Sequence, residues 1–192
     1  MIKKGGRMRA RIAAALVAAV CLAGCGGSDE VIEADPGLVN SDVGGAGSEA
    51  RVGEILDDLQ TAQRPEGTVI TLPENILFEF GSAELKPEAP AQLDKISEVL
   101  RFYGTAPVEI RGYSDSTGSE AFNLDIAERR AESVRDYLTG GPAIEPGRLT
   151  AIGFGERDPV APNENPDGSD NPEGREQNRR VEIVLGGVTA QP

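Results

Sequence analysis

The sequence predicts an α+β fold, a two-layer sandwich in which two helices pack on one mixed β-sheet. Two observations predict this fold. Two long stretches carry apolar residues at helical spacing, and short stretches with the composition of strands surround them in the order β-β-α-β-α-β-β. The globular part is predicted to span about residues 67–186, which is long enough to bury one hydrophobic core.

Five stretches have the composition of strands. "TVITLP" (68–73) alternates and is rich in β-branched residues, whereas "NILFEF" (75–80) is a short apolar run. "PVEIRGY" (107–113), "RLTAIGFG" (148–155) and "RRVEIVLG" (179–186) complete the set. We expect these five segments to form the sheet.

The two predicted helices lie between these strands. The first begins near Pro87, and its apolar stripe consists of Leu93, Ile96, Leu100 and Tyr103. The stripe of the second consists of Leu124, Ala127, Ala131, Val134 and Leu138. The second helix is predicted to end at Gly140, and residues 158–174 are predicted to be a polar loop.

The N-terminus has the composition of an export signal. Residues 1–11 hold five cations and no acid, and Ile12–Leu22 is an eleven-residue apolar run, too short to span a bilayer stably. The run leads into Leu22-Ala23-Gly24-Cys25, which resembles the lipobox of bacterial lipoproteins. We expect residues 1–24 to be a signal peptide and Cys25 to carry a lipid anchor to the membrane. An ordinary secretory signal is the alternative, because such signals also end in small residues.

Residues 25–66 are predicted to form a tether and a short amphipathic segment. From Gly26 to about Ser48 the chain has few large apolar residues, so it cannot bury enough surface to offset the entropy of ordering. Helical spacing then relates Val52, Ile55, Leu56 and Leu59. This segment is either a docking helix or the start of the domain. Residues 187–192 are expected to be a C-terminal tail.

Composition excludes several partners and chemistries. The formal net charge is −13, and it becomes −18 once the five cations of the signal are removed, which argues against nucleic acid as a partner. The sequence has no histidine, and its only cysteine outside the predicted signal is Cys25. Common zinc sites, disulfides and histidine-activated nucleophiles are therefore not expected, and we expect no cofactor.

Four stretches are similar to the successive motifs of the OmpA-like C-terminal domain family. They are "ILFEFGSAELKPEA", "IRGYSDSTGSEAFNLDIAERRAESV", "LTAIGFGERDPVAPN" and "NPEGREQNRRVEI". The resemblance implies a domain that binds peptidoglycan without covalent bonds, through the meso-diaminopimelate residue of the stem peptide. With the lipobox, it implies a lipoprotein of the peptidoglycan-associated type. Gly26 is not the Asp that resembles an inner-membrane retention signal, so we expect an outer-membrane lipoprotein that faces the periplasm.

The resemblance also nominates a pair of ligand-binding residues, Asp115 and Arg130. Meso-diaminopimelate ends in a second amino-acid centre with a free ammonium and a free carboxylate, so a selective site needs one acid and one guanidinium. Asp115 would receive the ammonium and Arg130 the carboxylate. Asn123 is seven residues before Arg130, on the same helix face, and can add a neutral hydrogen bond. On the sequence pattern alone, Asp115 equally fits a residue that orders its turn, and Arg130 a surface ion pair.

Further candidates for ligand contact come from three segments that match the family. Thr117 belongs to the same turn as Asp115. Phe80 and Gly81 follow "ILFEF"; Phe80 equally fits the core, and only a backbone contact is carried over to Gly81. The candidates in the last motif are Asn178, Arg179 and Arg180, where one arginine is expected to contact the ligand or to brace Asp115.

Three other possibilities were weighed. The loop that begins at Asn163 resembles the start of an EF-hand, but its twelfth position is Gly174, where calcium requires a bidentate Glu, so no metal is expected. A glycan hydrolase needs two closely placed carboxylates, whereas the acids here fall mostly in loops and on polar helix faces. The main alternative is a lipoprotein that binds envelope protein partners through the same fold.

Overall fold

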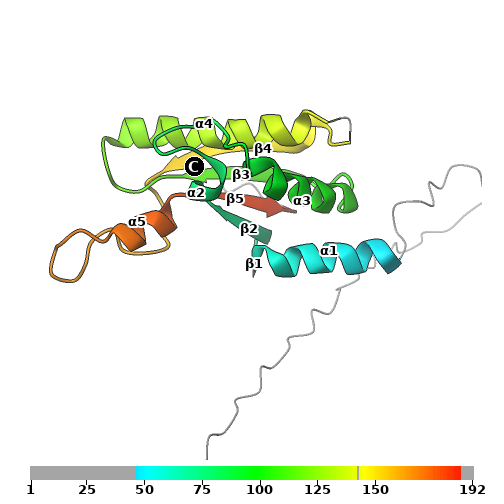
Figure 1. Ribbon diagram of the computed structural model, residues 1–192, viewed down its shortest axis with the longest axis horizontal. Helices are drawn as coiled ribbons and strands as arrows, with labels where there is room; N and C mark the ends of the chain where they lie inside the picture. The colour runs from blue at the N-terminus through cyan, green and yellow to red at the C-terminus, as the bar shows by residue number, and fades with distance from the viewer. Residues whose placement is uncertain (1–45, 142, 187–192) are drawn as a thin grey trace, which may run out of the picture. The chain divides into compact units, whose positions relative to one another are not determined.

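A computed structural model of the protein describes residues 46–141 and 143–186 (Figure 1). One five-stranded sheet has the strand order β1-β2-β5-β3-β4. The strands are β1 (Gln60–Arg64), β2 (Gly67–Pro73), β3 (Val108–Tyr113), β4 (Leu149–Gly155) and β5 (Arg180–Leu185). Strands β3 and β4 run parallel and the other neighbours antiparallel, so the sheet is mixed, as predicted.

The core lies between one face of the sheet and two helices, α3 (Ala89–Phe102) and α4 (Glu120–Thr139). Ile110 and Ile183 of the central strands are fully buried there, together with most of the apolar stripes of both helices. Tyr103 and Leu124, the end members of the two predicted stripes, are exposed instead. In Figure 1, α4 runs along β3 and β4, the parallel pair that it connects. The predicted α+β two-layer sandwich is confirmed.

Two glycines allow α4 to lie close to the sheet. A Cβ atom on Gly112 of β3 would lie 1.9 Å from the carbonyl oxygen of Ala127, and one on Gly153 of β4 would lie 2.8 Å from the backbone nitrogen of Glu128. Only residues without a side chain permit these contacts. The same stretch of α4 carries Arg130 on its buried face, so the close approach also fixes where that arginine lies.

The predicted strand at "NILFEF" is wrong. The chain leaves β2 and forms the single helical turn α2 (Glu74–Leu77), after which Phe78 makes only an isolated bridge to Leu85. Leu77 and Phe78 are buried, but an apolar run this short fits a helical turn as well as a strand. The missing strand is the polar and fully exposed β1, which forms a hairpin with β2.

A short helix, α5 (Pro172–Asn178), occupies the end of the predicted loop and leads into β5. The Asn171 side chain caps it by accepting a hydrogen bond from the Gly174 backbone nitrogen at 3.0 Å, and Pro172 opens the first turn. Its buried residues are Gly174 and Asn178, so it lacks the apolar stripe by which the longer helices were predicted. The short 3-10 turn η1 (Pro146–Arg148) precedes β4.

Helix α1 (Ala46–Asp58) begins the folded domain. Val52 is buried in the core, and Ile55, Leu56 and Leu59 pack against the core. Both α1 and β1 precede the expected start of the domain at Gly67. The predicted signal peptide, Cys25, the tether as far as residue 45 and the C-terminal tail lie outside the described residues. Within the described part, none of the helices combines the length and apolar character needed to cross a membrane.

Candidate functional site

Asp115 lies in the turn between β3 and α4, as predicted. Its Oδ1 accepts a hydrogen bond from the Thr117 backbone nitrogen at 2.9 Å, and its Oδ2 lies 2.6 Å from Nη1 of Arg179. Burial acts to raise the pKa of Asp115, but the hydrogen bonds from Thr117 and Arg179 outweigh it and hold the pKa below its usual value. Ser119, not Asp115, caps α4, so the Asp115 carboxylate orders the turn and stays ionised.

Arg130 projects from the buried face of α4, and its side chain is 4% exposed. Its Nη2 donates to Oε1 of Glu74 at 2.5 Å and its Nε donates to the carbonyl oxygen of Ser82 at 2.9 Å. Its guanidinium also lies 5.6 Å from the centre of the Phe78 ring. Burial lowers the pKa of Arg130 although Glu74 acts to raise it. The arginine is therefore not solvated; it is held by an internal acid.

Glu74 is a site residue that the sequence interpretation missed. It is the first residue of α2, 6% exposed, and its Oε2 lies 3.1 Å from Nε of Arg179. That contact lacks the geometry of a hydrogen bond. Burial raises the pKa of Glu74 above its usual value, against the effect of Arg130 and Arg179. Glu74 lies between the two segments predicted as strands, 68–73 and 75–80. No sequence pattern therefore indicated that its side chain faces α4.

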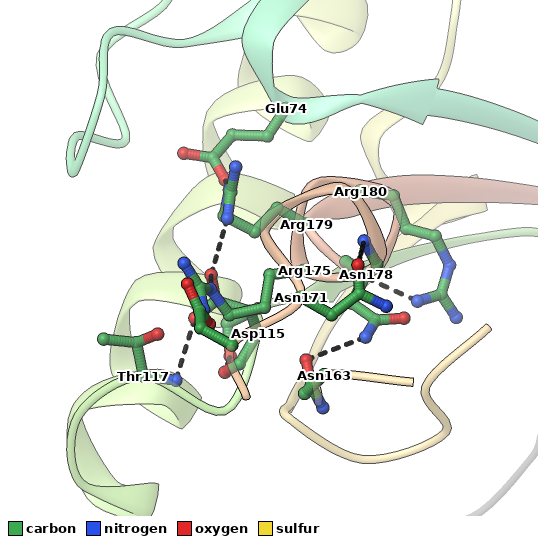
Figure 2. Close-up of polar contacts among 12 residues, drawn as sticks. Glu74, Asp115, Thr117, Asn163, Asn171, Arg175, Asn178, Arg179 and Arg180 are labelled. Carbon is green, nitrogen blue, oxygen red and sulfur yellow. Dashed lines mark hydrogen bonds and ion pairs between the residues drawn. The ribbon is translucent and has the colours of Figure 1, made fainter. Parts of the chain in front are cut away.

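The two adjacent arginines of the last motif have different surroundings. Arg179 lies between Glu74 and Asp115 and contacts both (Figure 2). Arg180 points away from them; its Nε donates to Glu182 at 3.0 Å and its guanidinium stacks 3.7 Å from the centre of the Tyr113 ring. Of the two, Arg179 is therefore the residue that braces Asp115.

Arg175 is a second basic residue beside Asp115 that the sequence interpretation did not include. It lies on α5, its Nε is 3.7 Å from Oδ2 of Asp115, and it also pairs with Asp170. Arg175 lies on helix α5, and Arg179 directly follows this helix. The helix therefore places two guanidinium groups beside the Asp115 carboxylate. The absence of an apolar pattern in α5 left this placement unpredicted.

The two candidate asparagines are both buried, with their amides already bonded. Asn123 on α4 donates to Oε2 of Glu156 at 2.8 Å. Asn178 accepts from the backbone nitrogens of Val160 and Ala161 and donates to Asn163. Asn178 therefore holds the loop after β4 against α5.

The loop after α2 supplies the exposed part of the site. Phe80 is 92% exposed and is not part of the core, and Gly81 adopts a left-handed backbone with φ of 68°. A cavity of about 90 Å³ lies between this loop and the side chains of Glu74 and Arg179. Its lining residues are Glu74, Asn75, Phe78, Phe80, Lys86, Glu176 and Arg179. The opening next to the buried charges is therefore flanked by an aromatic side chain.

Four side chains from separate parts of the chain thus form one charged cluster, which we call the charge cluster: Glu74, Asp115, Arg130 and Arg179. Two are acids and two are arginines, so the cluster is formally neutral. Its contacts run in sequence from Arg130 to Glu74, Arg179 and Asp115, with opposite charges at the two ends. Such an arrangement can receive a group that carries one positive and one negative charge.

Similar proteins occur among both curated sequences and solved structures. The photosystem I P700 chlorophyll a apoprotein A2 of Gloeobacter violaceus is 47% identical over 131 residues, which are 68% of this chain and 15% of that protein. The probable lipoprotein YiaD of Escherichia coli is 36% identical over 121 residues, 62% of this chain and 52% of that one. This chain thus matches about half or less of these relatives' lengths.

The fold also matches the structure of the cell wall anchor of the type VI secretion system from Pseudomonas aeruginosa. The TM-score is 0.59 with 30% identity, over 71% of this chain and 97% of that one. The model of the OmpA family matches residues 77–173, half of the sequence, including Asp115 and Arg130. The chain therefore belongs to the OmpA family.

Proposed function

We propose that this protein is a non-catalytic lipoprotein that anchors a membrane to the cell wall. In this proposal the folded domain binds the meso-diaminopimelate residue of the peptidoglycan stem peptide, and a lipid on Cys25 holds the other end of the chain in the membrane. Membership of the OmpA family supports the first part. The similarity to a cell wall anchor and to a probable lipoprotein supports the placement in the cell envelope.

The observation that carries the proposal is the position of Asp115 and Arg130 at opposite ends of one buried charge cluster. Asp115 comes from the turn after β3 and Arg130 from the third turn of α4, yet each contacts one member of the Glu74–Arg179 pair. The side-chain end of diaminopimelate carries an ammonium and a carboxylate on one carbon. Asp115 would pair with the ammonium and Arg130 with the carboxylate.

Exposed groups around the charge cluster are suited to the rest of the ligand. Phe80 can pack against apolar parts of the stem peptide, and the backbone at Gly81 and Thr117 can hydrogen-bond to its amide groups. Asn123 would act through Glu156, to which it donates, rather than by direct contact. We assign Asn178 and Arg180 to support of the site, since their side chains bond within the fold.

The same groups argue for binding rather than hydrolysis. Glu74 has a raised pKa and Asp115 a lowered one, a split that glycoside hydrolases also use. Here, however, Glu74 and Asp115 are both buried and both contact Arg179. A general acid or nucleophile needs an oxygen directed at the scissile bond, whereas these oxygens are directed at guanidinium groups and at the Thr117 backbone nitrogen.

Cosedimentation with purified sacculi tests the proposal. The chain that begins at Gly26, which lacks the predicted signal and the lipidated cysteine, should sediment with sacculi whose stem peptides contain diaminopimelate. It should stay in solution with lysine-type sacculi, and Asp115→Ala should abolish sedimentation. If the chain binds neither type of sacculus, it functions through a protein partner instead, and a pull-down from an envelope extract becomes the informative experiment.

A further inference from the structure

In this structure the two predicted binding residues already have partners. Glu74 accepts a hydrogen bond from Arg130 at 2.5 Å, and Nη1 of Arg179 lies 2.6 Å from Asp115. Arg130 is 3% exposed and Asp115 is 8% exposed. A ligand charge at either residue therefore competes with an internal partner, Glu74 at Arg130 and Arg179 at Asp115.

The internal partners also contact each other. Oε2 of Glu74 lies 3.1 Å from Nε of Arg179. Glu74 presents a carboxylate to Arg130, and Arg179 presents a cation to Asp115, at adjacent positions. Together, the two side chains offer the same pair of charges, to the same two residues, as the amino-acid end of the ligand would.

The contacts of Glu74 are incomplete. Its Oε2 has no hydrogen bond within the described residues, although the atom is buried and lies 3.1 Å from Nε of Arg179. Charged groups face Glu74 from three other elements: Arg130 on α4, Arg179 after α5 and Asp115 in the turn before α4. An ionised carboxylate with one unbonded buried oxygen is costly, and it gains when its partners rearrange around it.

We infer that Glu74 and Arg179 form an internal substitute for the ligand's zwitterion, which the ligand replaces on binding. This inference rests on the proposed function. Before binding, the contacts run from Arg130 to Glu74, Arg179 and Asp115. After binding, Arg130 holds the ligand carboxylate, Asp115 holds the ligand ammonium, and Glu74 and Arg179 pair with each other. Each charged group of the charge cluster therefore has a partner of opposite charge both before and after ligand binding.

Because of this exchange, Glu74 and Arg179 affect the choice between diaminopimelate and lysine peptides in different ways. Glu74 competes only with a ligand carboxylate, because Arg130 is the residue that it occupies. Arg179 competes with any ligand ammonium, because it occupies Asp115. A lysine-type stem peptide keeps the side-chain ammonium but has no carboxylate beside it. It can displace Arg179 and has nothing with which to displace Glu74.

The test is calorimetric titration of the chain from Gly26 with two synthetic tripeptide stems, one ending in meso-diaminopimelate and one in lysine. Glu74→Gln should bind the diaminopimelate peptide at least about threefold more tightly than the wild type and the lysine peptide within about twofold of it. Arg179→Gln should bind both peptides more tightly. Glu74→Gln keeps the length and shape of the side chain, whereas Arg179→Gln shortens the side chain and removes its charge.

Matched controls remove the same charges from the exposed face of α4. Glu128→Gln and Arg129→Gln lie directly before Arg130 in the chain, and their side chains are exposed. Both should leave the two affinities within about twofold, which separates local competition from the general effect of net charge. If Glu74→Gln does not fold by circular dichroism, Glu74→Asp replaces it, because the shorter acid withdraws from Arg130 and should act in the same direction.

The outcomes distinguish the inference from the function on which it rests. Weaker binding of the diaminopimelate peptide by Glu74→Gln would make Glu74 a ligand contact and overturn the inference, while the proposed function stands. An equal gain for both peptides with Glu74→Gln would also overturn it, since selective competition for the carboxylate would be absent. If the wild type binds neither peptide, the proposed function fails and the inference fails with it.

Discussion

Arg179 holds Asp115 in place: its Nη1 lies 2.6 Å from Oδ2 of the carboxylate, while its Nε lies 3.1 Å from Glu74. One guanidinium thus connects the turn after β3 to the helix α2 that follows β2. These two segments are far apart in the sequence, and they meet because β2, β5 and β3 are neighbours in the sheet. The arginine at the start of β5 is placed between them by that strand order.

The first prediction separates the two adjacent arginines by their effect on stability. Arg180 is 4% exposed and pairs with Glu182, which is 1% exposed, so Arg180→Gln leaves this buried acid with the partly exposed Arg64 as its remaining cationic partner. We expect a loss of about 3 kcal/mol in the free energy of unfolding, at the lower end for breaking a buried pair, because Arg64 still compensates part of the charge. Arg179→Gln should cost about 1–3 kcal/mol, because Glu74 keeps Arg130 and Asp115 keeps the Thr117 nitrogen. Urea denaturation measures both, and a larger loss for Arg179→Gln would contradict these assignments.

Much of the fold follows from local pattern. The stripes from Leu93 and from Leu124 have the period of helices, and the strands at β2, β3, β4 and β5 are short runs of β-branched and apolar residues. Strand β1 was not predictable because it is exposed and four of its five residues are polar; pairing with β2 makes it a strand. Helix α2 was not predictable because its four residues include only two apolar ones, too few for a periodicity that separates a strand from a helix.

Local sequence patterns also predicted part of the site. Asp115 and Arg130 belong to motifs that can be recognised in the sequence, and the structure brings them into one charge cluster. Glu74 was missed because it lies between two segments that were predicted as strands, and Arg175 because α5 has no apolar stripe. The choice between Arg179 and Arg180 needed the structure, since Arg179 is the C-cap residue of α5 whereas Arg180 begins β5, and adjacent residues there point in different directions.

The second prediction concerns the dependence of stability on pH. Burial raises the pKa of Glu74 above its ordinary value of 4.5. A carboxyl group with a raised pKa in the folded state binds its proton more tightly there, so its contribution to stability falls as pH rises from 4.5 through the raised pKa. Asp115 has the opposite sign: its lowered pKa stabilises the fold above 3.8, and this contribution is lost as pH falls through the folded pKa.

Urea denaturation between pH 4.5 and 7 isolates the contribution of Glu74. The free energy of unfolding of Glu74→Gln, minus that of the wild type, should increase with pH across this interval, because the variant lacks the ionisable group. Glu128→Gln, on the exposed face of α4, serves as the control for removal of one carboxylate. A constant difference for Glu74→Gln would show that Glu74 has no raised pKa.

The third prediction tests the geometry of Arg130. Arg130→Lys keeps the positive charge beside Glu74, but an ammonium cannot present two parallel donors to a carboxylate. We expect at least about a tenfold loss of affinity for the diaminopimelate tripeptide, or about 1.4 kcal/mol. Arg129→Lys is the matched control, because Arg129 is 61% exposed and pairs only loosely with Asp125. Wild-type affinity of a folded Arg130→Lys would exclude a forked contact.

The fourth prediction concerns the proposed lipid anchor. Cys25→Ala in the full-length chain should abolish labelling with a radioactive fatty acid and release the protein from the membrane fraction, because the thiol is the acceptor of the lipid. Cys21→Ala provides a close control, since Cys21 lies in the predicted signal and should not affect labelling. Persistent labelling of Cys25→Ala would disprove the lipobox assignment.

The central claim is that Asp115 and Arg130 bind the two charges of one amino-acid centre at the same time. The most direct measurement is calorimetric titration of the chain from Gly26 with three tripeptide stems. These end in meso-diaminopimelate, in diaminopimelate with its side-chain carboxylate amidated, and in lysine. The amidated peptide differs from the first by a single charge at the group assigned to Arg130. We predict that the first peptide binds at least about tenfold more tightly than either of the others. Equal affinity for the free and the amidated peptide would contradict the claim.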